Sequence, residues 1–82
     1  MKPGKENSAY LMQIWLPGMA NDECHYRYSW PQYDKYGASY QFNRMKRTLL
    51  ENHYKNNYTT AKFIEVKTGE VLCKMYLGKQ VK

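Results

Sequence analysis

The chain has 82 residues, which is enough for one domain with a small hydrophobic core. Hydrophobic residues make up 43% of it, which excludes a disordered chain, and the longest apolar run, residues 10–16, is too short to span a bilayer. Thirteen Lys and Arg against seven Asp and Glu give a net charge of +6, which favours polyanions, acidic protein surfaces or anionic lipid as partners.

The N-terminal part predicts a β-hairpin behind a polar tail. Residues 1–8 contain Pro and Gly and lack the apolar segment of a signal peptide, so we expect a frayed tail on a cytoplasmic protein. Residues 9–16 alternate in hydropathy and form the first predicted strand, which Pro17 and Gly18 end. Its inward row is Tyr10, Met12, Ile14 and Leu16, and its outward row is Leu11, Gln13 and Trp15.

A second strand is predicted over residues 24–30 and ends before Pro31, which lacks a backbone donor. Alternation separates its side chains into two rows. One row is Cys24, Tyr26, Tyr28 and Trp30, and the other is His25, Arg27 and Ser29. We assign the first row to the core, which leaves Arg27 on the outward face of the sheet.

From Ser39 onward the period becomes helical, and Ser39 is the predicted N-cap. The tandem residues Asn56 and Asn57 tolerate left-handed geometry and end the predicted helix. The expected buried stripe is Phe42, Met45, Leu49 and His53, with Leu50 at its edge. The expected solvent face is Arg44, Arg47, Glu51 and Lys55.

The clearest strand pair is the C-terminal hairpin over residues 59–77. A three-residue loop, Lys67-Thr68-Gly69, needs positive φ only at its glycine, and it sets Phe63 opposite Cys73. The same register sets Ala61 opposite Met75, Glu65 opposite Val71 and Lys62 opposite Lys74. The face without the lysine pair is the predicted core, because like charges tolerate water and not burial. That core face is Ala61, Phe63, Val71, Cys73, Met75 and Leu77, and the opposite face also carries Ile64, Val66, Leu72 and Tyr76.

This order of elements predicts a two-layer α+β fold of ββαββ type, with a four-stranded antiparallel sheet and one helix packed on one face. We expect a single domain over residues 1–82, with residues 79–82 frayed like residues 1–8. One face of the sheet is then left open. The compact pattern with its Lys-Thr-Gly-Glu turn resembles, in style, small accessory proteins of bacteria and phages. That resemblance implies an inhibitor or adaptor that acts by occupying a surface.

Catalytic and metal-binding patterns are weak in this sequence, and we expect a protein without enzymatic activity, cofactor or metal. Cys24 and His25 are neighbours on a strand, so their side chains point to opposite faces. A catalytic pair of Cys73 as nucleophile and His53 as base would require both side chains to converge in the core. The four possible ligands, Cys24, His25, His53 and Cys73, lack the short spacing of structural zinc sites. We expect reduced cysteines, no membrane association and no small-molecule substrate.

Protein binding is the preferred functional prediction, either to an acidic surface of a partner or by self-association. Tyrosine, tryptophan, methionine and arginine are enriched in interface cores, and the chain has nine tyrosines. The expected anchors on the open face are Trp15, Arg27 and Tyr76. An expected electrostatic rim of Arg44, Arg47 and Lys55 would steer association.

Nucleic-acid binding is the alternative. Tyr26, Arg27 and Tyr28 interleave aromatic and cationic groups on one strand, as single-strand binders do. Arg44, Lys46 and Arg47 would add phosphate contacts from the helix. This alternative requires the row that contains Tyr26 and Tyr28 to lie on the open face of the sheet, since under the helix these tyrosines would be core.

Overall fold

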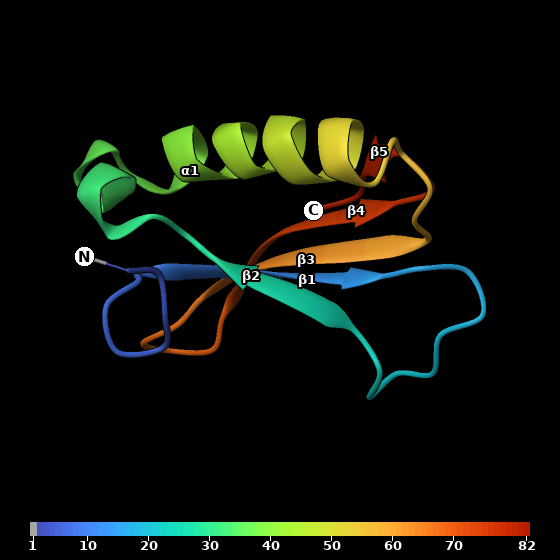
Figure 1. Cartoon of the computed structure of the whole chain (residues 1–82), viewed down its shortest axis with the longest axis horizontal. Coiled ribbons are helices and arrows are strands. Elements are labelled where there is room, and N and C mark those ends of the chain that lie inside the picture. Colours follow the sequence, from blue (N-terminus) through green and yellow to red (C-terminus); the bar gives the residue numbers. More distant parts are fainter. Residues whose placement is uncertain (1) are drawn as a thin grey trace.

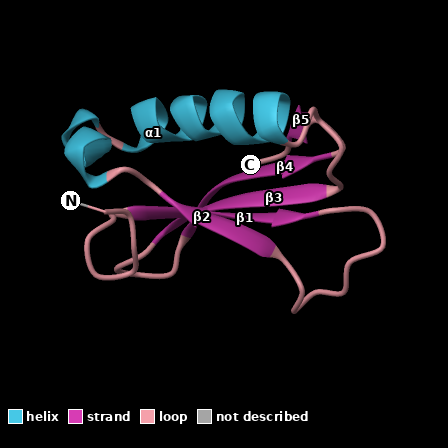
Figure 2. Cartoon of the chain, viewed as in Figure 1, coloured by secondary structure: helices cyan, strands magenta, loops and turns pink. Residues whose placement is uncertain are grey.

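Five antiparallel strands form one sheet, and helical segments cover one of its faces (Figures 1 and 2). The structure is a computed structural model that describes residues 2–82. The strands lie in the order β2-β1-β3-β4-β5, with bounds β1 (Tyr10–Trp15), β2 (His25–Tyr28), β3 (Thr60–Glu65), β4 (Val71–Tyr76) and β5 (Lys79–Gln80). The predicted α+β class is therefore confirmed, whereas the predicted four strands are in fact five.

The fifth strand comes from the C-terminal tail, which was expected to fray. Leu77 and Gly78 form a two-residue turn with φ of 49° and 82°, and positive φ at both positions is typical of a type I′ hairpin. Beyond the turn, the Val81 N–H donates to the Lys74 carbonyl at 2.8 Å. The prediction that Leu77 lies on the core face is wrong, because the turn carries its side chain away from the sheet and leaves it 61% exposed.

The helical layer has three parts: a 3-10 segment η1 (Pro31–Tyr36), the α-helix α1 (Ala38–Met45) and a segment with π-helical hydrogen bonding, η2 (Lys46–His53). α1 and η2 run on as one rod in Figure 1. Gly37 precedes Ala38 with φ of 95°, and no side chain caps this helix, so the expected cap at Ser39 is wrong. No helix within residues 2–82 combines the length and apolar character needed to cross a membrane.

π-Helical geometry changes which residues of η2 are buried. Each N–H bonds five residues back, as Tyr54 does to the Leu49 carbonyl at 2.8 Å, so the segment winds more slowly than an α-helix. As a result Leu50 is fully buried, Leu49 is half-buried and His53 is exposed. The predicted core position of His53 is therefore wrong, whereas Leu49 packs against the core from its edge and Leu50, expected at the edge of the stripe, is at its centre. Positive φ at Lys55 and Asn56 then ends the helical path.

The hydrophobic core lies between this helical layer and the sheet. Phe63 of β3 is at its centre, with its ring 5.1 Å from that of Tyr10 and 5.4 Å from that of Phe42. The buried apolar residues are Met12, Ile14, Phe42, Met45, Leu50, Tyr58, Ala61, Phe63 and Met75. Strand alternation therefore predicted the core correctly for β1 and for most of the β3–β4 hairpin.

A buried polar cluster fixes the start of the helical layer to the sheet. The Asp34 carboxylate accepts hydrogen bonds from the Ala9 N–H at 2.8 Å, the Ser29 hydroxyl at 2.7 Å and the Gln41 amide at 2.8 Å. The Ser8 hydroxyl donates to the Ser29 carbonyl, and Ser8 is buried. The last residue of the expected N-terminal tail is thus part of the folded structure.

The β3–β4 hairpin has the predicted register near its open end. Ala61 pairs with Met75, Phe63 pairs with Cys73, and Gly69 has the expected positive φ of 75°. A bulge between Phe63 and Ile64 shifts the rest, so that Val71 pairs with Ile64 instead of Glu65. The shift moves Val71 off the predicted core face. It also brings Leu72 against the core, where the sequence had assigned it to the opposite face.

In β2, the predicted facing of the side chains is reversed. Arg27 pairs with Met12, and Tyr26 pairs with Gln13. Because paired residues project to the same side of a sheet and Met12 is in the core, Arg27 lies on the helix side and Tyr26 on the other side. β2 is an edge strand, so its more apolar row is not forced under the helix. The assignment of Arg27 to the open face is therefore wrong.

Candidate functional site

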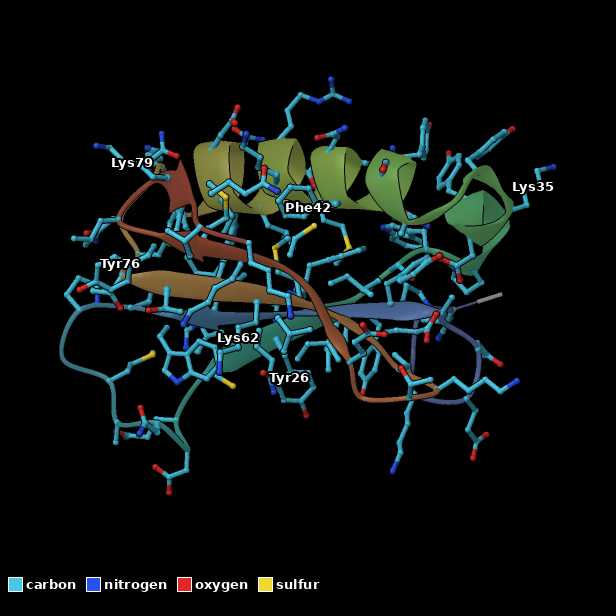
Figure 3. All side chains as sticks on the ribbon, turned by 180° about the vertical axis from the view of Figure 1, so that it is seen from behind. Tyr26, Lys35, Phe42, Lys62, Tyr76 and Lys79 are labelled. Carbon is cyan, nitrogen blue, oxygen red and sulfur yellow. The ribbon has the colours of Figure 1, made fainter. Side chains whose placement is uncertain are left out.

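The sheet face opposite the helices, here called the open face, carries no second layer within residues 2–82 (Figure 1). Figure 3 shows Tyr26 and Lys62 projecting from this side, whereas Phe42 points from the helix into the core. Strand pairing arranges its side chains in three rows that cross the sheet. These rows are Tyr28-Leu11-Ile64-Val71, Tyr26-Gln13-Lys62-Lys74, and Trp15-Thr60-Tyr76.

The middle row places two positive charges side by side. Lys62 and Lys74 are direct partners on neighbouring strands, so their Cβ atoms are about 5 Å apart, a distance at which like charges repel. The three rows contain no Asp or Glu. The Lys62 ammonium lies 5.2 Å from the centre of the Trp15 ring. An anion bound between the two lysines would relieve their repulsion.

Aromatic rings stand around this lysine pair. Tyr26 and Tyr28 contact each other edge to face with ring centres 5.9 Å apart, and Tyr26 is 54% exposed. Tyr76 on β4 lies on the same face, three strands away from Tyr26, and is 50% exposed. The Trp15 indole N–H donates to the Asn21 carbonyl at 3.0 Å, which fixes the orientation of the ring. The open face thus offers π surfaces at its margins and positive charge at its centre.

A concave surface, here called the edge groove, lies between β2 and the helix and has a volume of about 330 Å³. Tyr26 and Tyr28 line it as well as the open face, so the two surfaces are continuous over β2. Its other lining residues are Pro3, Arg27, Trp30, Arg44, Met45, Thr48 and Leu49. No acidic residue of the described chain is among them.

The edge groove contains two arginines, each with a defined local contact. The Arg44 guanidinium lies over the Tyr33 ring, 4.2 Å from its centre. An Arg27 Nη donates to the Tyr26 carbonyl at 2.9 Å. Tyr33 is in turn packed beside Tyr36 and Tyr40, with ring centres 6.3 Å away in both cases. Arg44 is therefore supported by an aromatic cluster at the start of the helical layer.

The structure divides the six residues expected to contact a protein partner. Trp15 and Tyr76 lie on the open face, as predicted from the alternation of their strands. Arg27 and Arg44 line the edge groove. Arg47 is exposed on η2 and Lys55 follows the helix, and neither lines the open face or the groove. Of the three residues of the expected electrostatic rim, Arg44 is the one that borders either surface.

The residues expected to contact nucleic acid are closer together. Tyr26, Arg27, Tyr28 and Arg44 all line the edge groove. Lys46 is half-buried at the junction of α1 and η2 and, like Arg47, lies outside the groove. The side chain of Tyr26 lies on the open face, which is the arrangement that this alternative requires.

Sequence reasoning missed two features of these surfaces. The lysine pair had been used only to choose the core face, although the hairpin register already placed Lys62 beside Lys74 on the opposite face. Trp30, 48% exposed in the edge groove, was assigned to the core row of the second strand. Pro31, the start of η1, was the available signal that the chain leaves the sheet at this point.

The cysteines and histidines are dispersed. Burial raises the pKa of the Cys73 thiol, which keeps it protonated at neutral pH and weakens it as a nucleophile. His53 is exposed and packs on Tyr54, away from the core in which a couple with Cys73 would have formed. His25 is within hydrogen-bond distance of the Tyr54 hydroxyl, at 3.1 Å. Among residues 2–82, no three His, Cys, Asp or Glu side chains are grouped so that they could hold a metal ion.

The geometry therefore offers surfaces for contact, namely an open face with lysines between aromatic rings and an adjoining groove with two arginines. Both combine positive charge with exposed π surface. Comparison of the chain with protein-family models, curated proteins and solved structures found no match.

Proposed function

We propose that this protein is a non-enzymatic domain that binds single-stranded nucleic acid across the open face of its sheet. The observation that carries the proposal is the middle row of the open face, where Lys62 and Lys74 stand side by side without a carboxylate and the Lys62 ammonium lies over the half-buried Trp15 ring. Unpaired bases stack on aromatic side chains, and phosphates are neutralised by lysine. The net charge of +6 supports association with a polyanion.

The dimensions of the open face support a short single strand as the ligand. Tyr26 on β2 and Tyr76 on β4 are separated by three strand-to-strand steps, or about 14 Å. Other sheets with exposed aromatic residues stack two or three bases over a comparable surface. A double helix presents its bases edge-on within grooves, and the flat face has no helix or ribbon that would enter one. The strand would cross the lysine pair with its bases on Tyr26, Trp15 and Tyr76.

A fluorescence-anisotropy titration tests this proposal, with labelled 12-nucleotide DNA and RNA of random sequence as probes. Wild-type protein should bind at about 50 mM salt and lose affinity steeply by about 200 mM, because binding releases counterions. Changing both Lys62 and Lys74 to Gln should weaken binding at least about tenfold and lower the slope of log K against log salt by about 1.4, or 0.7 per phosphate contact. Trp15→Ala should weaken binding about 5- to 150-fold, which is the value of one stacked base.

Lys35→Gln is the matched control, since it removes one positive charge from an exposed side chain on the helix side of the molecule (Figure 3). Its affinity should remain within about twofold of wild type, because a screened charge far from the strand contributes little. The proposal fails if wild-type protein binds neither probe at low salt. It also fails if the Lys62 and Lys74 double variant binds as tightly as the control.

An acidic protein surface is the second candidate partner, and the first row of the open face favours it. Leu11, Ile64 and Val71 lie next to one another there and have no evident use in contacting phosphates. Apolar residues beside positive charge fit a protein interface with an acidic rim. The same titration separates the candidates, because a protein-specific surface would leave both oligonucleotides unbound at low salt.

A further inference from the structure

We infer that the edge groove holds one nucleotide of the bound strand, with its base against Trp30 and its phosphate between Arg27 and Arg44. This inference rests on the proposed function and extends it from the open face to the groove beside it. The groove volume of about 330 Å³ is that of a small-ligand site, which is large enough for a single nucleotide.

Continuity of the two surfaces is the first argument. β2 is one of the two edge strands of the sheet, so one of its sides has no strand beside it. Tyr26 and Tyr28 border the open face on one side of β2 and the edge groove on the other. A strand that crosses the sheet toward β2 therefore meets the groove directly beyond these tyrosines.

Charge complementarity is the second argument. Two arginines, Arg27 and Arg44, are among the residues that line the groove, and no acidic residue is. Arginine presents a planar set of donors that matches phosphate in a bidentate manner, with stronger hydrogen bonds than a neutral donor makes. Arg44 is held over the Tyr33 ring, so less of its side-chain freedom is lost on binding than for an unsupported arginine.

The apolar part of the groove is the third argument. Trp30 is 48% exposed there, and Met45 and Leu49 line the helical side. These side chains make part of the groove wall apolar, and the exposed Trp30 indole is a surface on which a base can stack. Phosphate and base requirements are thus met within one groove, as a nucleotide demands and a simple anion does not.

Tryptophan fluorescence tests the inference, because Trp15 and Trp30 are the only tryptophans of the chain and lie on the two surfaces separately. In a Trp15→Phe background, a 12-nucleotide oligonucleotide should quench Trp30. In a Trp30→Phe background, it should quench Trp15. Arg44→Gln should weaken binding about tenfold and reduce the salt slope by about 0.7, as loss of one phosphate contact predicts.

Arg47→Gln is the matched control, since it removes the same charge from the same helical rod outside both surfaces, and it should bind within about twofold of wild type. Arg44→Lys keeps the charge and should recover only part of the affinity, because lysine cannot bond phosphate in a bidentate manner. Circular dichroism of each variant checks that the fold is intact.

The outcomes of this experiment distinguish the groove from the open face. Quenching of Trp15 without quenching of Trp30, together with wild-type affinity of Arg44→Gln, would overturn the inference and leave the proposed function standing. Quenching of Trp30 by poly-glutamate and not by the oligonucleotide would also overturn it, in favour of an acidic peptide. Absence of any oligonucleotide binding would remove the proposed function and the inference together.

Discussion

The two faces of the sheet are built from the same strands and differ in almost every physical property. On the covered face, Met12, Ala61, Phe63 and Met75 are buried against the helices. Their sequence neighbours on the open face include Gln13, Lys62 and Lys74. Alternation alone therefore separates an apolar surface from a cationic one at a distance of one residue along each strand.

This difference indicates which face stabilises the fold. Burial of apolar area stabilises the covered face, whereas the adjacent lysines of the open face repel each other. The open face nevertheless carries two large aromatic side chains, Tyr76, which is 50% exposed, and Trp15, which is half-buried. Substitutions on the two faces should therefore differ in their effect on the free energy of unfolding.

The largest expected effect is from truncating the central aromatic residue of the covered face. Phe63→Ala should lower the free energy of unfolding by about 3–5 kcal/mol, since it removes a buried ring and leaves a cavity. Trp15→Ala, on the open face of the adjacent β1, should cost about 1.5 kcal/mol or less, because its ring is only half-buried. Urea denaturation monitored by circular dichroism measures both values. Equal costs would show that the open face also belongs to the core.

Strand alternation and glycine chemistry account for what the sequence predicted correctly. The covered rows of β1 and β3 follow from alternation, and Gly69 set the hairpin register because it is the loop residue that adopts positive φ without strain. This register also placed Lys62 beside Lys74, so the centre of the candidate site was predictable. The facing of β2 was not predictable, because an edge strand can expose either of its two rows of side chains. Only the pairing of Arg27 with Met12 shows which row lies on the helix side.

Most features that the sequence did not predict depend on contacts between residues far apart in the chain. Asp34 joins Ala9, which precedes β1, Ser29, which follows β2, and Gln41 of α1, and no local pattern identifies such a cluster. The edge groove likewise depends on where the helix crosses the sheet. The bulge at Ile64 and the π-helical turn of η2 each shift the register by about one residue, which moves side chains between faces without altering the hydropathy pattern.

The second largest effect on the free energy of unfolding is expected for the helical residues that pack on the covered face. Leu50→Ala should lower the free energy of unfolding by about 2–5 kcal/mol, because Leu50 is fully buried in the core. Leu49→Ala is the matched variant and should cost about 1 kcal/mol, since Leu49 is half-buried at the edge groove. The same denaturation experiment compares them. A larger cost for Leu49 would mean that η2 winds as an ordinary α-helix, with its stripe as the sequence predicted.

The smallest expected effect concerns Leu77, which the sequence assigned to the covered face and the structure assigns to neither. With φ of 49° and an exposed side chain, Leu77 bears the conformational strain of the type I′ turn without gaining burial. Leu77→Asn should raise the free energy of unfolding by about 0.5–1 kcal/mol, because Asn-Gly is the preferred pair in this turn. Val81→Asn replaces another exposed apolar residue without positive φ and should stay within about 0.5 kcal/mol of wild type. Destabilisation by Leu77→Asn would instead place Leu77 in the covered row, and the boundary between the two faces would have to be redrawn at the end of β4.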